Sequence, residues 1–560
     1  MDSKAQPTNN SEYTPPEGST TEHAWSLADS FRYRAIAEWM LLREKEKPVA
    51  EIFHVAYLQE EAAADRPITF VFNGGPGAAS AFLHVGAVGP RRVVFAADGT
   101  AGPPPVRIVD NAESWLPFTD LVFVDPVGTG FSRAVPGDAA GGGAGANVLS
   151  STGASGAGGT SGAAAGSGAT GKGGGSGQEE KEKEFFGLNR DLKALGEFMQ
   201  KFLSKHGRWE SPVFVAGESY GGFRAAKLTK LLQEGYGIGL NGAVLISPAL
   251  EFSLLDSSDY DVLPWVDLFP SLAAAAAFHK KGRWSDGSYS LEAVLSDAEH
   301  FAAATLPAAL IRGGDLDDVL VEAASRLGLS SDLVAKLSGR VSARRFVREL
   351  LAQDGMVCGM YDATITARDP YPDRESYEGP DPTLFGIERV FASGINSHLR
   401  GNLGVQTDRD YHLLSMDVNR SWKIDADRHA LESQVGATDD LRYGMSLNPH
   451  LKVRISHGIY DLVTPYFSSN RLARLMRLQK PISRNGATLE SGNLSLVHYG
   501  GGHMFYAWEE SRRSFRNDIS DFYQGALAGG AGTTRGGGVE PSGSGGGSGA
   551  GSGGGGSRGA

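Results

Sequence analysis

Six short apolar runs recur along the chain, each bounded by glycine, proline or polar residues. Their length and their β-branched side chains are typical of strands. Their nearly continuous apolarity indicates burial on both faces, as in a mostly parallel sheet. The predicted strands cover residues 68–72, 121–124, 213–216, 242–246, 453–455 and 494–497.

Between several of these runs, apolar residues recur at every third or fourth position, the spacing of an amphipathic helix. The pattern is clearest at residues 188–203 and is repeated at 223–232. Strands that alternate with helices predict an α/β fold, with a central, mostly parallel sheet flanked by helices. Apolar positions within residues 31–58 predict an antiparallel lead-in to that sheet.

The alternation stops after the fourth run and resumes at Val453, and the residues between are rich in alanine, leucine and charged side chains at helical spacing. We therefore predict a mostly helical cap inserted into the core. Two stretches of glycine, alanine and serine cannot bury enough apolar surface to offset the entropy of ordering. The expected organisation is a disordered segment at 1–24, the first part of the core at 25–254 with a low-complexity insert at 137–183, the cap at 255–448, the second part of the core at 449–524 and a disordered tail at 525–560.

Charge and cysteine content narrow the classes of partner. The net charge is −12, and basic residues occur only in short pairs, so we expect no nucleic-acid partner. The single cysteine, Cys358, permits no intrachain disulfide. Residues 1–21 are polar, and no apolar run approaches the roughly 20 residues of a membrane-spanning helix. We therefore expect no signal peptide and no membrane partner, which for this sequence indicates a cytoplasmic protein. The sequence does not predict the oligomeric state.

Ser219 is the strongest candidate for chemistry. It lies in Gly-Glu-Ser-Tyr-Gly at 217–221, after the predicted strand at 213–216 and before the helix that starts near Phe223. Such a turn strains the serine backbone and exposes its hydroxyl beside a helix N-terminus that favours negative charge. The alternative is a glycine-rich turn with an incidental serine, which the strand and helix context disfavours.

A serine hydroxyl is a weak nucleophile without a base. In enzymes that carry this type of serine turn, the catalytic residues follow one another along the chain in the order serine, acid, histidine. His503 is the best candidate for the base because it follows the predicted strand at 494–497 within a run of glycines. Asp461 follows the strand at 453–455 and is expected to orient the imidazole and stabilise its protonated form. The alternative for Asp461 is a helix N-cap or an Asx-turn.

Two other histidines lie near these segments. His498 continues the predicted strand and is expected to pack or pair structurally, and His457 precedes Gly458 close to the acid. Neither has both the chain order and the glycine-rich setting of His503.

Asn-Gly-Gly-Pro-Gly at 73–77 follows the predicted strand at 68–72. Backbone without side chains can turn an N–H toward a reacting carbonyl, as the Gly-Gly loop of an oxyanion hole does. A phosphate-binding loop is the alternative. It is disfavoured because no Lys-Ser/Thr follows and the glycine spacing fits neither phosphate-loop pattern.

Together these segments closely resemble the serine carboxypeptidase family of α/β-hydrolases, in particular its bacterial-type members. The matching motifs occur in the family's order and lie at 73–77, 124–132, 217–222, around Asp461 and at 502–504. The resemblance implies an α/β-hydrolase fold and hydrolysis of C-terminal peptide bonds through an acyl-enzyme on Ser219. His503 would act as base and then acid, and Asp461 would orient it.

The same resemblance implies the remaining site residues. Backbone N–H groups of Gly75 and Tyr220 would form the oxyanion hole, and Asn73 and Glu218 would hydrogen-bond the terminal carboxylate of the substrate. It implies no metal ion, no organic cofactor, and peptide or protein C-termini as substrates. Family members are usually exported, vacuolar or lysosomal.

Three positions depart from the family pattern. Val71 stands in place of a tryptophan, and Ala78 in place of a cysteine, so the associated disulfide is absent. Ala87 replaces a second glutamate that would share a proton with Glu218. Two close carboxylates raise one pKa and keep a proton for the substrate carboxylate, and here that pair is incomplete. The incomplete pair leaves open a serine esterase or acyltransferase with the same triad. The resemblance also allows a non-catalytic stabilising partner.

Overall fold

The computed structural model describes residues 13–27, 30–135, 182–255, 258–313, 317–374, 377–424, 435–478, 483–485 and 488–528. Nearly all of the predicted insert at 137–183 lies outside these ranges, as does most of the predicted disordered tail at 525–560. Residues 525–528 are the last residues of a helix, so the expectation of disorder is wrong for them.

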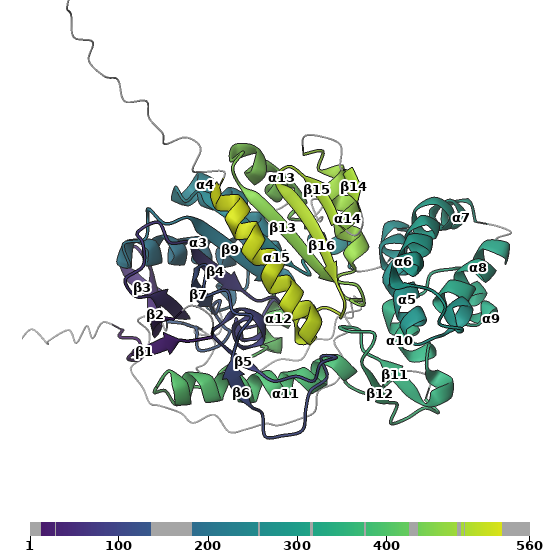
Figure 1. Ribbon diagram of the computed structural model, residues 1–560, viewed down its shortest axis with the longest axis horizontal. Helices are drawn as coiled ribbons and strands as arrows, with labels where there is room; N and C mark the ends of the chain where they lie inside the picture. Colours follow the sequence, from purple (N-terminus) through teal and green to yellow (C-terminus); the bar gives the residue numbers. More distant parts are fainter. Residues whose placement is uncertain are drawn as a thin grey trace, which may run out of the picture.

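A twelve-stranded sheet dominates the described part of the chain, in the order β1-β2-β3-β7-β4-β9-β10-β13-β16-β15-β14, with β8 paired to β3 (Figure 1). Neighbouring strands from β7 to β16 run parallel. They are β7 (Asp120–Val124), β4 (Ile68–Phe72), β9 (Val213–Glu218), β10 (Leu240–Ile246), β13 (Lys452–Gly458) and β16 (Leu494–Tyr499). These are the six strands predicted from the apolar runs, and the predicted α/β fold with a mostly parallel sheet is confirmed.

The sheet is extended by antiparallel strands at both edges. The first edge holds β1 (Ser19–Trp25), β2 (Phe31–Glu44) and β3 (Lys47–Gln59), with β8 (Arg133–Ala134) beside β3. The other edge ends in β15 (Thr488–Ser491) and β14 (Ser483–Asn485). The predicted antiparallel lead-in is therefore present.

Strand β1 begins within the segment 1–24 that was expected to be disordered, so that expectation is wrong from Ser19 onward. The strand pairs with β2 in a continuous antiparallel register. Trp25 is buried and its ring stacks on Phe31 at a centroid distance of 5.9 Å. A single tryptophan at the end of a polar segment is too little to predict a strand from the sequence.

Helices cover both faces of the sheet (Figure 1). One face carries α3 (Leu188–Lys205), α4 (Tyr220–Tyr236) and α13 (Thr438–Leu447), and the apolar cluster on the opposite face includes α11 (Pro382–Ser397) and α15 (Glu509–Ala528). Strand residues alternate between the two clusters, as the pleat requires. On β9, Val213 and Val215 join the first cluster while Phe214 and Ala216 join the second.

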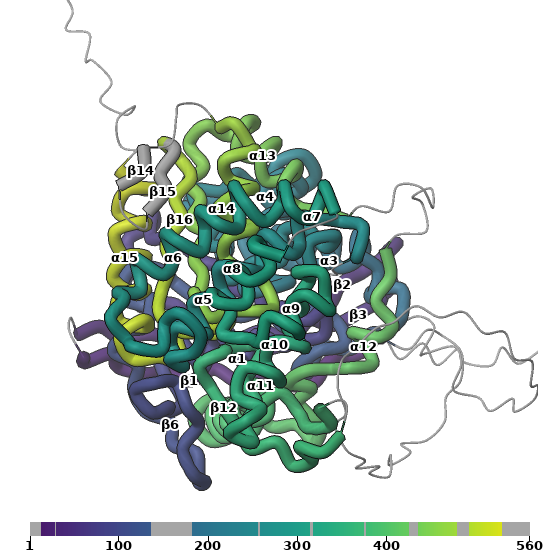
Figure 2. Tube along the Cα trace, turned by 90° about the vertical axis from the view of Figure 1, so that its right-hand side faces the viewer, coloured from purple at the N-terminus to yellow at the C-terminus, as the bar shows by residue number. Residues whose placement is uncertain are grey.

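A third apolar cluster forms the cap beside the sheet, and Figure 2 shows its helices α5, α8, α9 and α10 facing the viewer. The cap consists of α5 (Leu263–Phe278), α6 (Leu291–His300), α7 (Leu306–Arg312), α8 (Asp317–Leu327), α9 (Ser331–Lys336), α10 (Ala343–Glu349), β11 (Met356–Cys358) and β12 (Thr366–Arg368). Within the predicted insertion 255–448, α11 and α13 bury their apolar faces against the core clusters instead. The cap, defined by the elements of the third cluster, is therefore narrower than expected and spans about 263–368.

Shorter elements complete the described chain. They are α1 (Ala81–Leu83), η1 (His84–Val88), β5 (Arg91–Val93), β6 (Ile108–Asp110), η2 (Phe252–Leu254), η3 (Gly282–Trp284), η4 (Phe301–Thr305), η5 (Ala352–Asp354), η6 (His398–Asn402), α12 (Met416–Ser421), α14 (Tyr466–Leu475) and η7 (Phe505–Ala507). Among the described helices, none is both long and apolar enough to cross a membrane.

Candidate active site

Ser219 occupies a sharp turn between β9 and α4. Its backbone has φ 58° and ψ −121°, a conformation that non-glycine residues rarely adopt and that costs of order 1–3 kcal/mol. A Cβ on Gly217 would lie only 1.9 Å from the carbonyl oxygen of Gly221, so the doubled-back chain requires glycine there. Helix α4 begins at Tyr220, and Ser219 itself is only partly buried.

His503 and Asp461 form a direct pair. His503 Nδ1 lies 2.7 Å from Asp461 Oδ2, and both side chains are buried. Asp461 Oδ1 also accepts the backbone N–H groups of Val463 at 2.8 Å and Thr464 at 3.0 Å. Because a carboxylate only accepts hydrogen bonds, the proton of a neutral His503 is on Nδ1, which leaves Nε2 free to accept another.

The pKa of His503 reflects this setting. Burial alone would lower it, but the charge of Asp461 and its hydrogen bond outweigh burial and raise the pKa of the imidazole. The pair therefore favours an imidazole that takes up a proton, as a general base must.

The carboxyl end of β10 connects the serine to this pair. Ser219 N donates to Ile246 O at 2.9 Å, and Ala249 N donates to Ser219 O at 3.2 Å. One residue after β10, Ser247 Oγ donates to the carbonyl oxygen of His503 at 2.9 Å. Since β9, β10, β13 and β16 are adjacent parallel strands, their carboxyl ends share one edge, and the structure brings all three predicted residues to it.

Thr464 is a site residue that the sequence analysis missed. Its Oγ1 lies 2.6 Å from Asp461 Oδ2, 3.0 Å from His503 Nδ1 and 3.0 Å from the carbonyl oxygen of Ser247. The Thr464 hydroxyl therefore contacts Asp461, His503 and the backbone of Ser247, which lies just after β10. Its position three residues after an aspartate was the available signal, because such a spacing is common in Asx-type turns.

The glycine loop at 73–77 packs directly against the serine turn. A Cβ on Gly74 would lie 2.7 Å from Ser219 Cβ and 2.8 Å from the backbone nitrogen of Tyr220. Gly75 has φ 100°, which favours glycine, and a Cβ there would lie 2.5 Å from Gly77 N. The structure thus places the two predicted oxyanion-hole residues beside Ser219, with Gly75 in the glycine loop and Tyr220 at the first position of α4.

Asn73 and Glu218 contact each other next to the nucleophile. Asn73 Nδ2 donates to Glu218 Oε2 at 2.5 Å, and Asn73 Oδ1 accepts the backbone N–H of Leu83 at 3.0 Å. Tyr506 is a second residue that the sequence analysis missed, and its hydroxyl lies 3.0 and 2.9 Å from the two carboxylate oxygens of Glu218. A hydroxyl from η7 therefore contacts the carboxyl group whose expected partner position is Ala87.

Glu218 holds a proton more tightly than an ordinary glutamate. Burial raises its pKa to about 7, although His503, Tyr506 and Asn73 each oppose that rise. Near neutral pH a substantial fraction of Glu218 is therefore a neutral acid that can donate a hydrogen bond, without a second carboxylate beside it.

The other two histidines are tied to structural partners. His498 Nε2 lies 2.9 Å from Asn470 Oδ1, and His457 Nε2 lies 2.8 Å from Ser469 Oγ. Burial lowers the pKa of His498 to about 4 and that of His457 to about 3. Both remain neutral at physiological pH, and neither pairs with Asp461.

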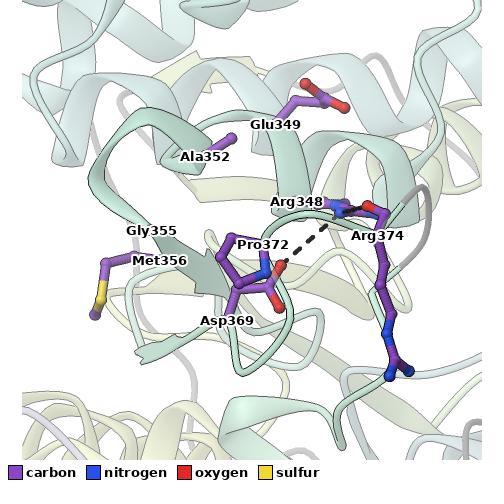
Figure 3. A pocket seen from close by; sticks show the side chains of 8 residues that line it. All are labelled: Arg348, Glu349, Ala352, Gly355, Met356, Asp369, Pro372 and Arg374. Atoms are coloured by element: carbon purple, nitrogen blue, oxygen red, sulfur yellow. Dashed lines mark hydrogen bonds and ion pairs between the residues drawn. The ribbon is translucent and has the colours of Figure 1, made fainter.

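One cavity of about 210 Å³ opens within the cap (Figure 3). Its lining comes from α10, the turn before β11 and the segment after β12, and includes the charged residues Arg348, Glu349, Asp369 and Arg374. None of the predicted site residues lines it. No group of three or more histidine, cysteine, aspartate or glutamate side chains in the described residues could hold a metal ion.

Residues 38–252, which contain the glycine loop and the serine turn, match the family model described as serine carboxypeptidase. This part of the chain is similar to the serine carboxypeptidase family. Serine carboxypeptidase-like 13 of Arabidopsis thaliana is 25% identical over 206 residues, covering 36% of this chain and 37% of that protein. The pheromone-processing carboxypeptidase KEX1 of Cryptococcus gattii is 41% identical over 83 residues, covering 15% of this chain and 12% of that protein. The matched part of the chain spans little more than a third, at most, of the length of these curated relatives.

Solved structures similar to this chain include a prohormone-processing carboxypeptidase from Saccharomyces cerevisiae. It is 16% identical, with a TM-score of 0.46 over 88% of this chain and 91% of that one. A proline iminopeptidase from Mycobacterium smegmatis is 12% identical, with a TM-score of 0.33 over 91% and 99% of the two chains.

Proposed function

We propose that this protein is a serine-type carboxypeptidase that hydrolyses C-terminal peptide bonds of peptides or proteins through an acyl-enzyme on Ser219. The observation that carries this proposal is the buried Glu218, which adjoins Ser219 in the chain and is bonded by Asn73 and Tyr506. An enzyme that cleaves at a chain terminus must recognise a carboxylate, and a neutral carboxylic acid with an amide beside it can do so.

In the proposed first step, His503 Nε2 accepts the Ser219 proton as the oxygen attacks the carbonyl carbon of the last peptide bond. Asp461 stabilises the imidazolium, and the N–H groups of Gly75 and Tyr220 stabilise the oxyanion. The C–N bond then breaks, and His503 gives its proton to the leaving amine. Water, activated by His503, attacks the acyl-enzyme and releases the shortened peptide, which restores the Ser219 hydroxyl.

The terminal carboxylate of the substrate is assigned to Asn73 and Glu218. Protonated Glu218 donates its O–H, and the Asn73 amide supplies N–H donors. This pairing keeps two carboxylates from meeting as like charges, which would cost binding energy in a buried site.

The pH dependence tests this assignment. For a peptide with a free C-terminus, we expect kcat/KM to fall about tenfold per pH unit above about 7, because the proton of Glu218 is lost there. The Tyr506 hydrogen bond lowers the pKa of Glu218, so Tyr506→Phe should move this fall to higher pH. Glu218→Gln cannot ionise and should remove the fall. Identical pH profiles for wild type and both variants would contradict the assignment.

A fluorophosphonate probe and a matched pair of substrates separate the candidate functions. We expect the probe to label Ser219, as located by peptide mapping, and the enzyme to release single residues from an N-blocked dipeptide. Rapid turnover of an ester with the same acyl group and no peptide release would instead support the esterase or acyltransferase alternative, which the alanine at position 87 favours. A wild-type protein that the probe leaves unlabelled would support the non-catalytic alternative.

A further inference from the structure

The loop of the β11–β12 hairpin, residues 359–365, reaches from the cap to both loops that carry the acid and the base. The hairpin pairs Cys358 with Thr366, so the residues between them form its loop. Its contacts fall on the immediate neighbours of Asp461 and on the His503 segment, which are more than 40 residues apart in the chain.

On the acid side, the hairpin loop makes two backbone hydrogen bonds. Leu462 N donates to Met360 O at 3.0 Å, and Ala363 N donates to Tyr460 O at 3.1 Å. The residues before and after Asp461 are therefore both tied to this loop.

On the base side, the contacts are tighter. His503 N donates to Tyr361 O at 2.5 Å, and Gly502 N donates to Asp362 Oδ2 at 2.9 Å. A Cβ on Gly502 would lie 2.1 Å from Tyr361 O and 2.4 Å from Asp362 Cα, so the two chains touch at Gly502. The hairpin loop therefore fixes the backbone from which the imidazole projects.

The Tyr361 ring packs edge-on against the His503 ring at a centroid distance of 5.4 Å, and the Asp362 side chain makes the side-chain hydrogen bond to the His503 segment, with both of its oxygens engaged. Oδ1 accepts Thr364 N at 3.0 Å and Thr364 Oγ1 at 2.6 Å, while Oδ2 accepts Gly502 N at 2.9 Å and Trp508 Nε1 at 3.1 Å. All four partners are donors, and the residue is buried. An ionised carboxylate can accept all four hydrogen bonds, because both of its oxygens act only as acceptors.

We propose that Asp362 is a positioning residue for catalysis: through Gly502 it holds His503 in register with Asp461, so that the cap completes the geometry of the active site. This inference rests on the proposed function, since it concerns the same base. It assigns the cap hairpin a role in aligning the catalytic groups. A displacement of about 1 Å in a catalytic group can lower the rate about 100-fold, which sets the scale of the expected effect.

Asp362→Asn is the sharpest test because it keeps the shape of the side chain. In either orientation of the amide, the asparagine NH₂ faces two hydrogen-bond donors, so two of the four hydrogen bonds are lost. We expect kcat to fall about 10- to 100-fold while KM changes by less than about twofold. The downfield proton resonance of the His503–Asp461 hydrogen bond should shift or broaden in the same variant.

Asp267→Asn is the matched control. Asp267 is also a buried carboxylate of the cap that bonds the core, through Arg471 Nε at 2.9 Å and Nη2 at 2.6 Å, but it lies on α5 and does not touch the His503 segment. We expect it to leave the resonance and kcat near their wild-type values. Equal changes in both variants would show a general effect of cap docking and would overturn the proposal.

A folded Asp362→Asn protein with wild-type kcat and an unchanged resonance would also overturn it. If Asp362→Asn does not fold, Trp508→Phe removes one donor to Oδ2 without a change of charge. That variant should lower kcat by a smaller factor and perturb the resonance, and an unchanged resonance would count against the proposal. The resonance reports on the pair even if the wild type releases no C-terminal residue, so failure of the proposed function would be seen separately.

Discussion

Ser219→Ala is expected to lower kcat for peptide hydrolysis about 10⁶-fold, the largest effect of any substitution considered. The variant keeps Cβ, so the turn and its packing against Gly74 are retained, but no oxygen is left to form the acyl-enzyme. Binding of peptide should persist, because the groups assigned to the terminal carboxylate are unchanged. Single-turnover kinetics and probe labelling measure the loss.

Ser271→Ala is the matched control for this substitution. Ser271 is buried in α5 of the cap, and its hydroxyl has no hydrogen-bond partner in the described structure. The same chemical change at Ser271 should leave kcat within about twofold of the wild-type value, because the substitution is outside the active site and removes no hydrogen bond of the described structure. Probe labelling that persists in Ser219→Ala would show that another residue is the nucleophile.

Asp461→Asn is expected to lower kcat about 10⁴-fold. Asp461 accepts from His503 Nδ1 on one oxygen and from two backbone N–H groups on the other. An asparagine that keeps the backbone bonds presents its NH₂ to His503, which favours the tautomer with the proton on Nε2. That tautomer cannot accept the Ser219 proton, so the base is lost while the fold is kept.

The pKa of His503 provides a second readout for this variant. The charge and hydrogen bond of Asp461 raise the pKa of His503 against the effect of burial. Removing them should lower that pKa, so any residual activity should begin to rise at a lower pH than in the wild type. Unchanged kcat, with the melting temperature and pH profile of the wild type, would contradict the role assigned to Asp461.

Local patterns sufficed to predict the parallel strands and the residues that follow them. Strands buried on both faces, such as β4 and β9, have nearly continuous apolar runs, which are hard to confuse with loops. Ser219, Asp461 and His503 follow three of these strands, so their place at one edge follows from strand direction alone. Strand β1 lacks such a run, since its alternating residues are mostly exposed or partly exposed, and it was missed.

The residues that support the site depend on contacts between distant parts of the chain. Tyr506 and Glu218 are 288 residues apart, and Asp362 and Gly502 are 140 apart. Nothing near Tyr506 distinguishes it from a core tyrosine, and Asp362 lies in a cap whose limits were themselves uncertain from the sequence. The C-terminal boundary of the cap was predicted at residue 448 instead of near 368. Amphipathic helices such as α11 and α13 have the same sequence pattern whether they pack on a cap or on a sheet.

The central claim is that this site cleaves at a free C-terminus. It is tested most directly by giving the enzyme two N-blocked peptides of the same sequence, one with a free C-terminal carboxylate and one with an amide, and by identifying the products by mass spectrometry. We predict release of the last residue from the free acid, with kcat/KM about 10- to 100-fold above that for the amide, because the amide lacks the charged group assigned to Asn73 and Glu218. Equal hydrolysis of both peptides, or cleavage of neither with turnover of simple esters, would contradict the account.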